Sequence, residues 1–151
     1  MTSYSHEQRL VIAREIGDRG GEATAFANLG KAYYGLNDPS HAIELYEQQL
    51  TIAREIGAPH IEAHGLYGKA AAIYVLGDKQ QAIRLLEIML RIYQQIEAPE
   101  AEEAEARLSL WKDDLLHTRV SGKSQWSLSL KEALRMAWTI FRFLRKTLRK
   151  P

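Results

Sequence analysis

Ile12-Ala13-Arg14-Glu15-Ile16-Gly17 recurs letter for letter at residues 52–57, forty positions later. The same spacing relates two further sets of positions: Leu10, Leu50 and Leu90, and Glu22, Glu62 and Glu102. A fixed period of this length is typical of stacked-repeat proteins, in which each unit buries its apolar face against its neighbours. The repeat therefore predicts the class of fold and makes a binding surface the default expectation for function.

Helical periodicity and turn signals predict an all-α chain of seven helices. The expected helices cover about 4–16, 22–36, 39–56, a segment from about 59 to the turn at 77–78, 79–96, a segment after Pro99, and 127–149. Gly17-Asp18 and Gly20-Gly21 are predicted to separate the first two helices. Asp38 is expected to cap the third helix, with Pro39 at its first position.

The composition excludes several classes of protein. The chain has 151 residues, which is enough for one domain with a hydrophobic core, and it contains no cysteine. Disulfides and cysteine-based zinc or redox sites are therefore excluded, and a reducing setting is the simplest interpretation. The first residues lack the layout of a secretion signal, and the longest uncharged apolar-rich run near the C-terminus, residues 136–141, is too short to span a bilayer. We expect a cytoplasmic protein, with a peripheral membrane location as the alternative.

Residues 23–34, which read Ala-Thr-Ala-Phe-Ala-Asn-Leu-Gly-Lys-Ala-Tyr-Tyr, resemble the first-helix signature of the tetratricopeptide repeat (TPR) family. Asp38 and the run Ala42-Ile43-Glu44-x-Tyr46 fit the turn and second helix of that family. The forty-residue period is longer than the usual ~34 and resembles the extended subclass found in kinesin light chains and bacterial multi-repeat proteins. The resemblance covers residues 1–97.

The resemblance implies a short right-handed superhelical α-solenoid of antiparallel helix hairpins, here expected over residues 1–117. Small Gly30 and Ala42 are expected where the two helices of a hairpin approach closely. The pattern weakens along the chain, because Lys69 and Ala70 replace Leu29 and Gly30 of the first repeat.

In TPR proteins the first helices of successive repeats line a concave groove that holds a partner segment. Transferred position by position, this implies a protein- or peptide-binding groove with polar, aromatic and basic side chains. The candidate residues are Asn28, Lys31, Tyr34, His64, Tyr67, Tyr74, Arg107 and Trp111. The alternative for Tyr67 and Tyr74 is that they pack between helices, because their spacing also fits a core stripe.

The C-terminal segment differs in charge from the rest of the chain. Residues 1–122 contain 12 Lys/Arg and 18 Asp/Glu, whereas residues 123–151 contain 8 Lys/Arg and 1 Asp/Glu. We expect a linker over 118–126 and a basic amphipathic helix over 127–150, which either caps the solenoid or binds an anionic membrane surface or a partner. Its candidate contact residues are Lys131, Arg135, Trp138, Phe141, Arg142, Lys146 and Arg149. Nucleic acid is the least favoured partner.

The sequence offers little support for catalysis. His60 and His64 have a spacing that suits a metal, but no third ligand is identifiable. Gly122-Lys123-Ser124 lacks the first glycine and the strand of a phosphate-binding loop. We therefore predict a non-enzymatic interaction scaffold with no cofactor and no metal site. The first helix has no partner helix within a repeat, so a second copy of the chain could cover its apolar face.

Overall fold

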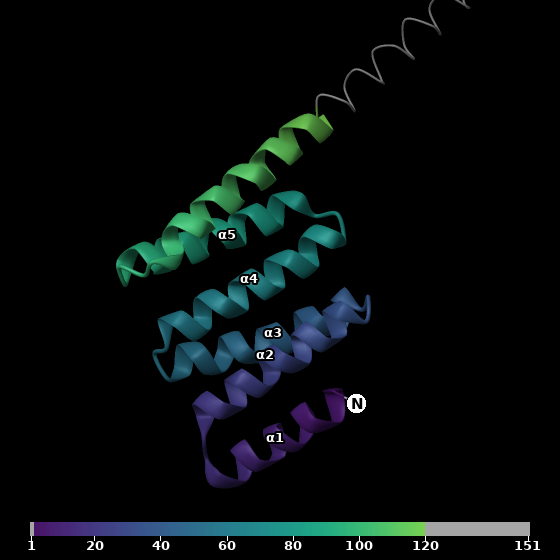
Figure 1. Cartoon of the computed structure of the whole chain (residues 1–151), viewed down its shortest axis with the longest axis vertical. Coiled ribbons are helices and arrows are strands. Elements are labelled where there is room, and N and C mark those ends of the chain that lie inside the picture. Colours follow the sequence, from purple (N-terminus) through teal and green to yellow (C-terminus); the bar gives the residue numbers. More distant parts are fainter. Residues whose placement is uncertain (1, 120–151) are drawn as a thin grey trace, which may run out of the picture. The chain divides into compact units, whose positions relative to one another are not determined.

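The computed structural model describes residues 2–119, and within them every regular element is a helix. The helices are α1 (Thr2–Ile16), α2 (Arg19–Gly35), α3 (Pro39–Glu55), α4 (Pro59–Val75) and α5 (Lys79–Gln95), and residues 100–119 are also helical (Figure 1). The prediction of an all-helical chain is confirmed, as are the positions of the first six helices. The seventh predicted helix and most of the predicted linker lie outside the described residues.

The chain divides into two compact units, residues 1–112 and 113–151. In the first unit each helix packs against the next one along the chain, which is the arrangement expected of a solenoid. In addition α2 contacts α4, whereas α3 does not contact α5. The layer that contains α2 and α4 is therefore the more closely packed of the two, and we call it the inner layer.

Helix starts and turns repeat with the sequence. Asp18, Asp38 and Asp78 each cap a helix, and each side chain accepts a hydrogen bond from the backbone N–H three residues later. One boundary prediction was wrong: Gly20 and Gly21 do not break the chain but lie in the first turn of α2. The Asp18 carboxylate accepts a hydrogen bond from the Gly21 N–H at 2.8 Å, and this cap offsets the weak helix propensity of the two glycines.

The exactly repeated segment has a structural role at the turns between hairpins. Arg14 Nε donates to Glu22 across the α1–α2 turn at 2.9 Å, and Arg54 Nε donates to Glu62 across the α3–α4 turn at 2.7 Å. Arg14 and, less strongly, Arg19 lower the pKa of the buried Glu22 carboxyl against the opposing effect of its burial. At the third turn the positions are Gln94 and Glu102, so this ion pair has been lost.

One cluster of the core packs around a tyrosine ring. Tyr46 of α3 is 5% exposed and packs with Ala42 and Ala72. A Cβ atom added at Gly30 of α2 would lie 3.0 Å from this ring, and one added at Gly68 of α4 would lie 2.3 Å from it. The prediction that Gly30 permits a close helix approach is confirmed, and Gly68 of α4 has the same role toward this ring.

We therefore expect Gly68→Ala to destabilise the protein. Alanine favours a helix by about 1 kcal/mol over glycine, but here it must displace the buried Tyr46 ring, and overpacking of this kind typically costs about 1–3 kcal/mol. Chemical denaturation monitored by circular dichroism measures the change.

The matched control is Gly35→Ala, also in a helix, where an added Cβ meets nothing within 4 Å. We expect Gly35→Ala to be neutral or stabilising. Equal effects of the two substitutions would show that the close approach to Tyr46 does not limit stability.

A second prediction concerns the residue with a left-handed backbone conformation that follows each outer helix, that is, α1, α3 and α5. Gly17 and Gly57 have φ values of +70° and +63°, and Glu97 occupies the equivalent place with φ +51°. A side chain in this conformation costs about 1–2 kcal/mol, so Glu97→Gly should raise the free energy of unfolding by about 1 kcal/mol.

The reverse change, Gly57→Glu, should lower stability by a similar amount because it places a side chain in the same conformation. Denaturant midpoints of both variants test this expectation. A loss of stability in Glu97→Gly would contradict it.

Candidate functional site

The candidate groove residues lie on the inner layer, within α2, α4 and the helix that starts at residue 100. Lys31 and His64 are exposed, Tyr34 is 38% exposed, and Asn28, Tyr67, Tyr74, Arg107 and Trp111 are half-buried. All eight side chains therefore keep accessible surface, but they differ in how far neighbouring side chains cover them.

The structure brings four of these residues together in two pairs. The guanidinium of Arg107 lies 4.8 Å from the centroid of the Tyr67 ring, and Arg107 Nη1 also donates a hydrogen bond to the Tyr67 hydroxyl. The Tyr74 and Trp111 rings stack with their centroids 4.2 Å apart. Each pair joins α4 to the next inner helix, so these aromatic side chains both pack between helices and remain partly exposed.

A second polar group lies further toward α2. Gln49 of α3 is buried, its Nε2 donates to the Ile61 carbonyl at 3.1 Å, and the same atom lies 3.3 Å from His64 Nδ1. A donor amide at this distance favours the neutral His64 ring with Nδ1 as acceptor. His64 is exposed as a whole, but the partial burial of its ring beside Gln49, and then the charge of Lys31, lower the pKa of His64.

His60 and His64 do not share neighbours. The His60 ring lies 6.5 Å from the Tyr93 ring, whereas His64 faces Gln49. Within residues 2–119, no group of three His, Asp or Glu side chains is positioned to hold a metal ion.

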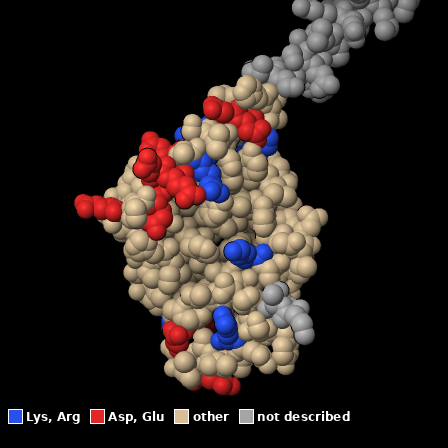
Figure 2. Space-filling model, in the orientation of Figure 1, with Lys and Arg blue, Asp and Glu red and all other residues tan. Residues whose placement is uncertain are grey.

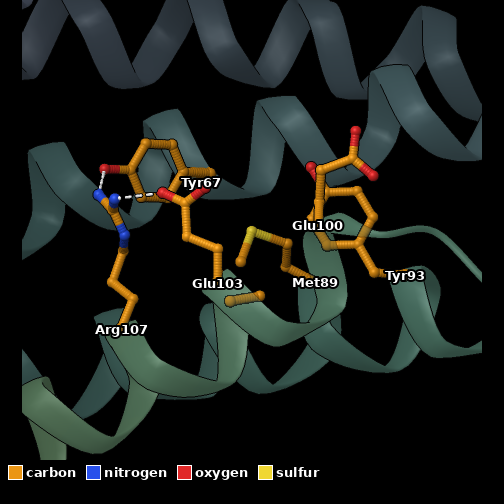
Figure 3. Close-up of a pocket in the computed structure, with 7 residues that line it drawn as sticks. Tyr67, Met89, Tyr93, Glu100, Glu103 and Arg107 are labelled. Carbon is orange, nitrogen blue, oxygen red and sulfur yellow. Dashed lines mark hydrogen bonds and ion pairs between the residues drawn. The ribbon is translucent and has the colours of Figure 1, made fainter.

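Sequence reasoning missed one concave site. A cavity of about 120 Å³ opens between α4, α5 and the helix that starts at residue 100 (Figure 3). The residues that line it are Tyr67, Met89, Tyr93, Glu100, Glu103, Ala104 and Arg107. Glu100 and Glu103 lie in the first turn of a helix, where carboxylates ordinarily complement the helix dipole without forming a site. The signal that could have identified them is Tyr93 in the last turn of the preceding helix.

Acidic side chains gather over the same end of this unit. Figure 2 shows them over the turn between α5 and the following helix, where the exposed residues are Glu97, Glu100, Glu102, Glu103 and Glu105. Burial raises the pKa of the Tyr93 hydroxyl, and Glu100 and Glu103 raise it further. The cavity therefore lies in a region of negative potential.

Another apolar surface lies on α1. Tyr4, Val11, Ile12 and Ile16 are 67%, 53%, 54% and 71% exposed, and Ile12 and Ile16 line a shallow depression against α2. Self-association through this helix stays a prediction. The basic helix expected at residues 127–150, with its membrane alternative, lies outside the described residues, and no helix within residues 2–119 is long and apolar enough to cross a membrane.

The titration of His64 provides a test of its placement near Lys31. We expect its pKa to lie below 6.5, and Lys31→Gln should raise it because the neighbouring positive charge is removed. Imidazole NMR signals recorded between pH 4 and 9 measure both values.

Lys69→Gln is the matched control, because the Lys69 ammonium pairs with Glu47 at 2.8 Å and does not perturb His64. Because the folded-state pKa is lowered, His64 stabilises the fold above pH 6.5, and this contribution is lost as the pH falls toward the folded-state value. An unchanged His64 pKa in Lys31→Gln would contradict the placement of these two side chains.

Comparison with known protein families supports the interpretation of the fold. Residues 25–59 match the model of the family described as tetratricopeptide repeat. The match covers most of α2, all of α3 and the first residue of α4, which together contain the best-preserved hairpin. No curated protein matches the chain. The matched hairpin and the stacked helices together support a TPR-type repeat at residues 25–59, and TPR repeats generally serve as non-enzymatic scaffolds for protein–protein interaction.

Proposed function

We propose that this protein is an interaction scaffold whose inner layer binds an extended segment of another protein. The observation that carries the proposal is the row of accessible polar and aromatic side chains along α2, α4 and residues 100–112, on the tighter-packed side of the stack. A row of this kind offers aromatic anchors and hydrogen-bond partners to one extended chain.

Two parts of the row have different roles in this proposal. Tyr67, Tyr74 and Trp111 are held in place by contacts between helices, so they present rigid surfaces that lose little conformational entropy on binding. Lys31 and Tyr34 are the more exposed members, and they are free to adjust to a partner. Rigid anchors beside adaptable polar groups suit the capture of a peptide.

The longer-period subclass of the family is part of the proposal. It is supported by structural features that recur at forty-residue spacing: left-handed residues at Gly17, Gly57 and Glu97, and caps at Asp38 and Asp78. Repeats of this length stack into the same kind of layered solenoid.

The test is a selection of random linear peptides displayed against the immobilised full chain, followed by affinity measurements on the enriched peptides. Substitution of both Lys31→Glu and Tyr34→Ser should weaken the enriched peptides at least about tenfold, because a few anchors carry most of the energy of such interfaces.

The control substitutes the outer layer in the same way, with Arg84→Glu and Ile88→Ser on α5. Ile88 is 37% exposed, close to the value for Tyr34, and Arg84 is exposed like Lys31. Circular dichroism melts establish that both variants fold. Failure to enrich any peptide, or equal losses in the two variants, would reject the inner layer as the binding surface.

A further inference from the structure

The cavity beside Tyr93 has room for the end of one side chain. Its volume of about 120 Å³ is well below the roughly 300–1,000 Å³ of a typical small-molecule site. It opens on the inner layer, because Tyr67 and Arg107, two of the candidate groove residues, form one of its ends. A ligand group that enters it would therefore belong to a chain lying along the groove.

The lining of this cavity suits a positive charge. Tyr67 and Tyr93 supply aromatic rings, the buried Met89 supplies a polarisable floor, and Glu100 and Glu103 supply carboxylates (Figure 3). Cations are attracted both to aromatic ring faces and to carboxylates, and both attractions strengthen where water is partly excluded.

The protein itself already uses one end of the cavity in this way. The Arg107 guanidinium lies over the Tyr67 ring, and its Nη2 atom donates to the Glu103 carboxylate at 2.8 Å. At the other end lie Tyr93 and Glu100, and among the described residues the Glu100 carboxylate has no hydrogen bond or ion pair (Figure 3). The end formed by Tyr93 and Glu100 thus has an aromatic ring and a carboxylate, as the end formed by Tyr67 and Glu103 does, but it lacks the arginine.

We propose that the end formed by Tyr93 and Glu100 binds a lysine or arginine side chain of the partner segment. This inference rests on the proposed function, since it names the chemistry that the groove selects. The surrounding acidic residues favour the same choice, because they attract a basic segment before contact and disfavour an acidic one.

Methyl NMR of the full chain provides a direct test. The chain has three methionines, Met1, Met89 and Met136, and Met89 is the one that lines the cavity within the described residues. With ¹³C-methyl-methionine labelling, we would titrate acetyl-lysine amide and acetyl-arginine amide at constant ionic strength. Acetyl-norleucine amide, an uncharged analogue of similar size, and acetyl-glutamate amide serve as comparison probes.

We expect a saturable shift of the Met89 signal with the two cationic probes and no saturation with norleucine or glutamate. Tyr93→Leu should weaken the lysine probe about 2- to 30-fold through the lost cation–π contact. Glu100→Gln should weaken it about fivefold through the lost charge. The matched control joins Glu102→Gln to Glu105→Gln, which removes two exposed carboxylates of the same helix that do not line the cavity.

Each other outcome overturns the inference. Equal binding of norleucine and lysine would identify a purely apolar pocket, and stronger binding of glutamate would assign the cavity to Arg107 as an anion site. No response of Met89 to any probe would show that the cavity holds no ligand group. None of these results depends on the peptide selection, which separately tests whether the groove binds a segment. Enriched peptides that contain no lysine or arginine would support peptide binding by the groove but would contradict the cation site.

Discussion

The stack depends on the contact of one tyrosine ring with two glycines. Tyr46 of α3 reaches between Gly30 of α2 and Gly68 of α4, and neither position has space for a Cβ atom without movement of the ring. The contact lets three helices from two hairpins approach around one buried side chain. It also accompanies the direct contact of α2 with α4. The candidate groove residues of these two helices therefore lie on neighbouring helices of one layer.

The next layer of the stack shows how the packing survives a change of sequence. Forty residues after Tyr46, Gly30 and Gly68 the chain has Leu86, Ala70 and Leu108, and all three are buried. A smaller side chain on the outer helix is accompanied by larger ones on the inner helices, so in this layer the inner helices supply more of the buried side chains. The weakening of the sequence repeat along the chain is therefore not accompanied by a loss of buried packing between the helices.

The sequence predicted the helices well and the site only in part. The forty-residue period locates every turn, but Gly20 and Gly21 were misread because a side-chain cap from Asp18 outweighs their propensity. The pairing of Tyr67 with Arg107 follows from the repeat, since residues forty apart occupy equivalent places on neighbouring inner helices. The cavity could not be predicted in this way. It joins an outer helix, through Met89 and Tyr93, to the next inner one, and the repeat relates inner helices only to each other.

The charge near the inner layer also differs between its two ends. Burial is the main cause of the lowered pKa of His64 and of the raised pKa of Tyr93, and nearby charges add to both shifts. The added charge is the positive Lys31 toward α2, whereas beyond α4 it is the negative carboxylates of Glu100 and Glu103. A partner segment that spans both ends would have a preferred orientation, with a basic side chain over the cavity and neutral or acidic groups near Lys31. The same hydrophobic stacking that forms the groove could accept either orientation, so charge, and not shape, would set the direction of the bound chain.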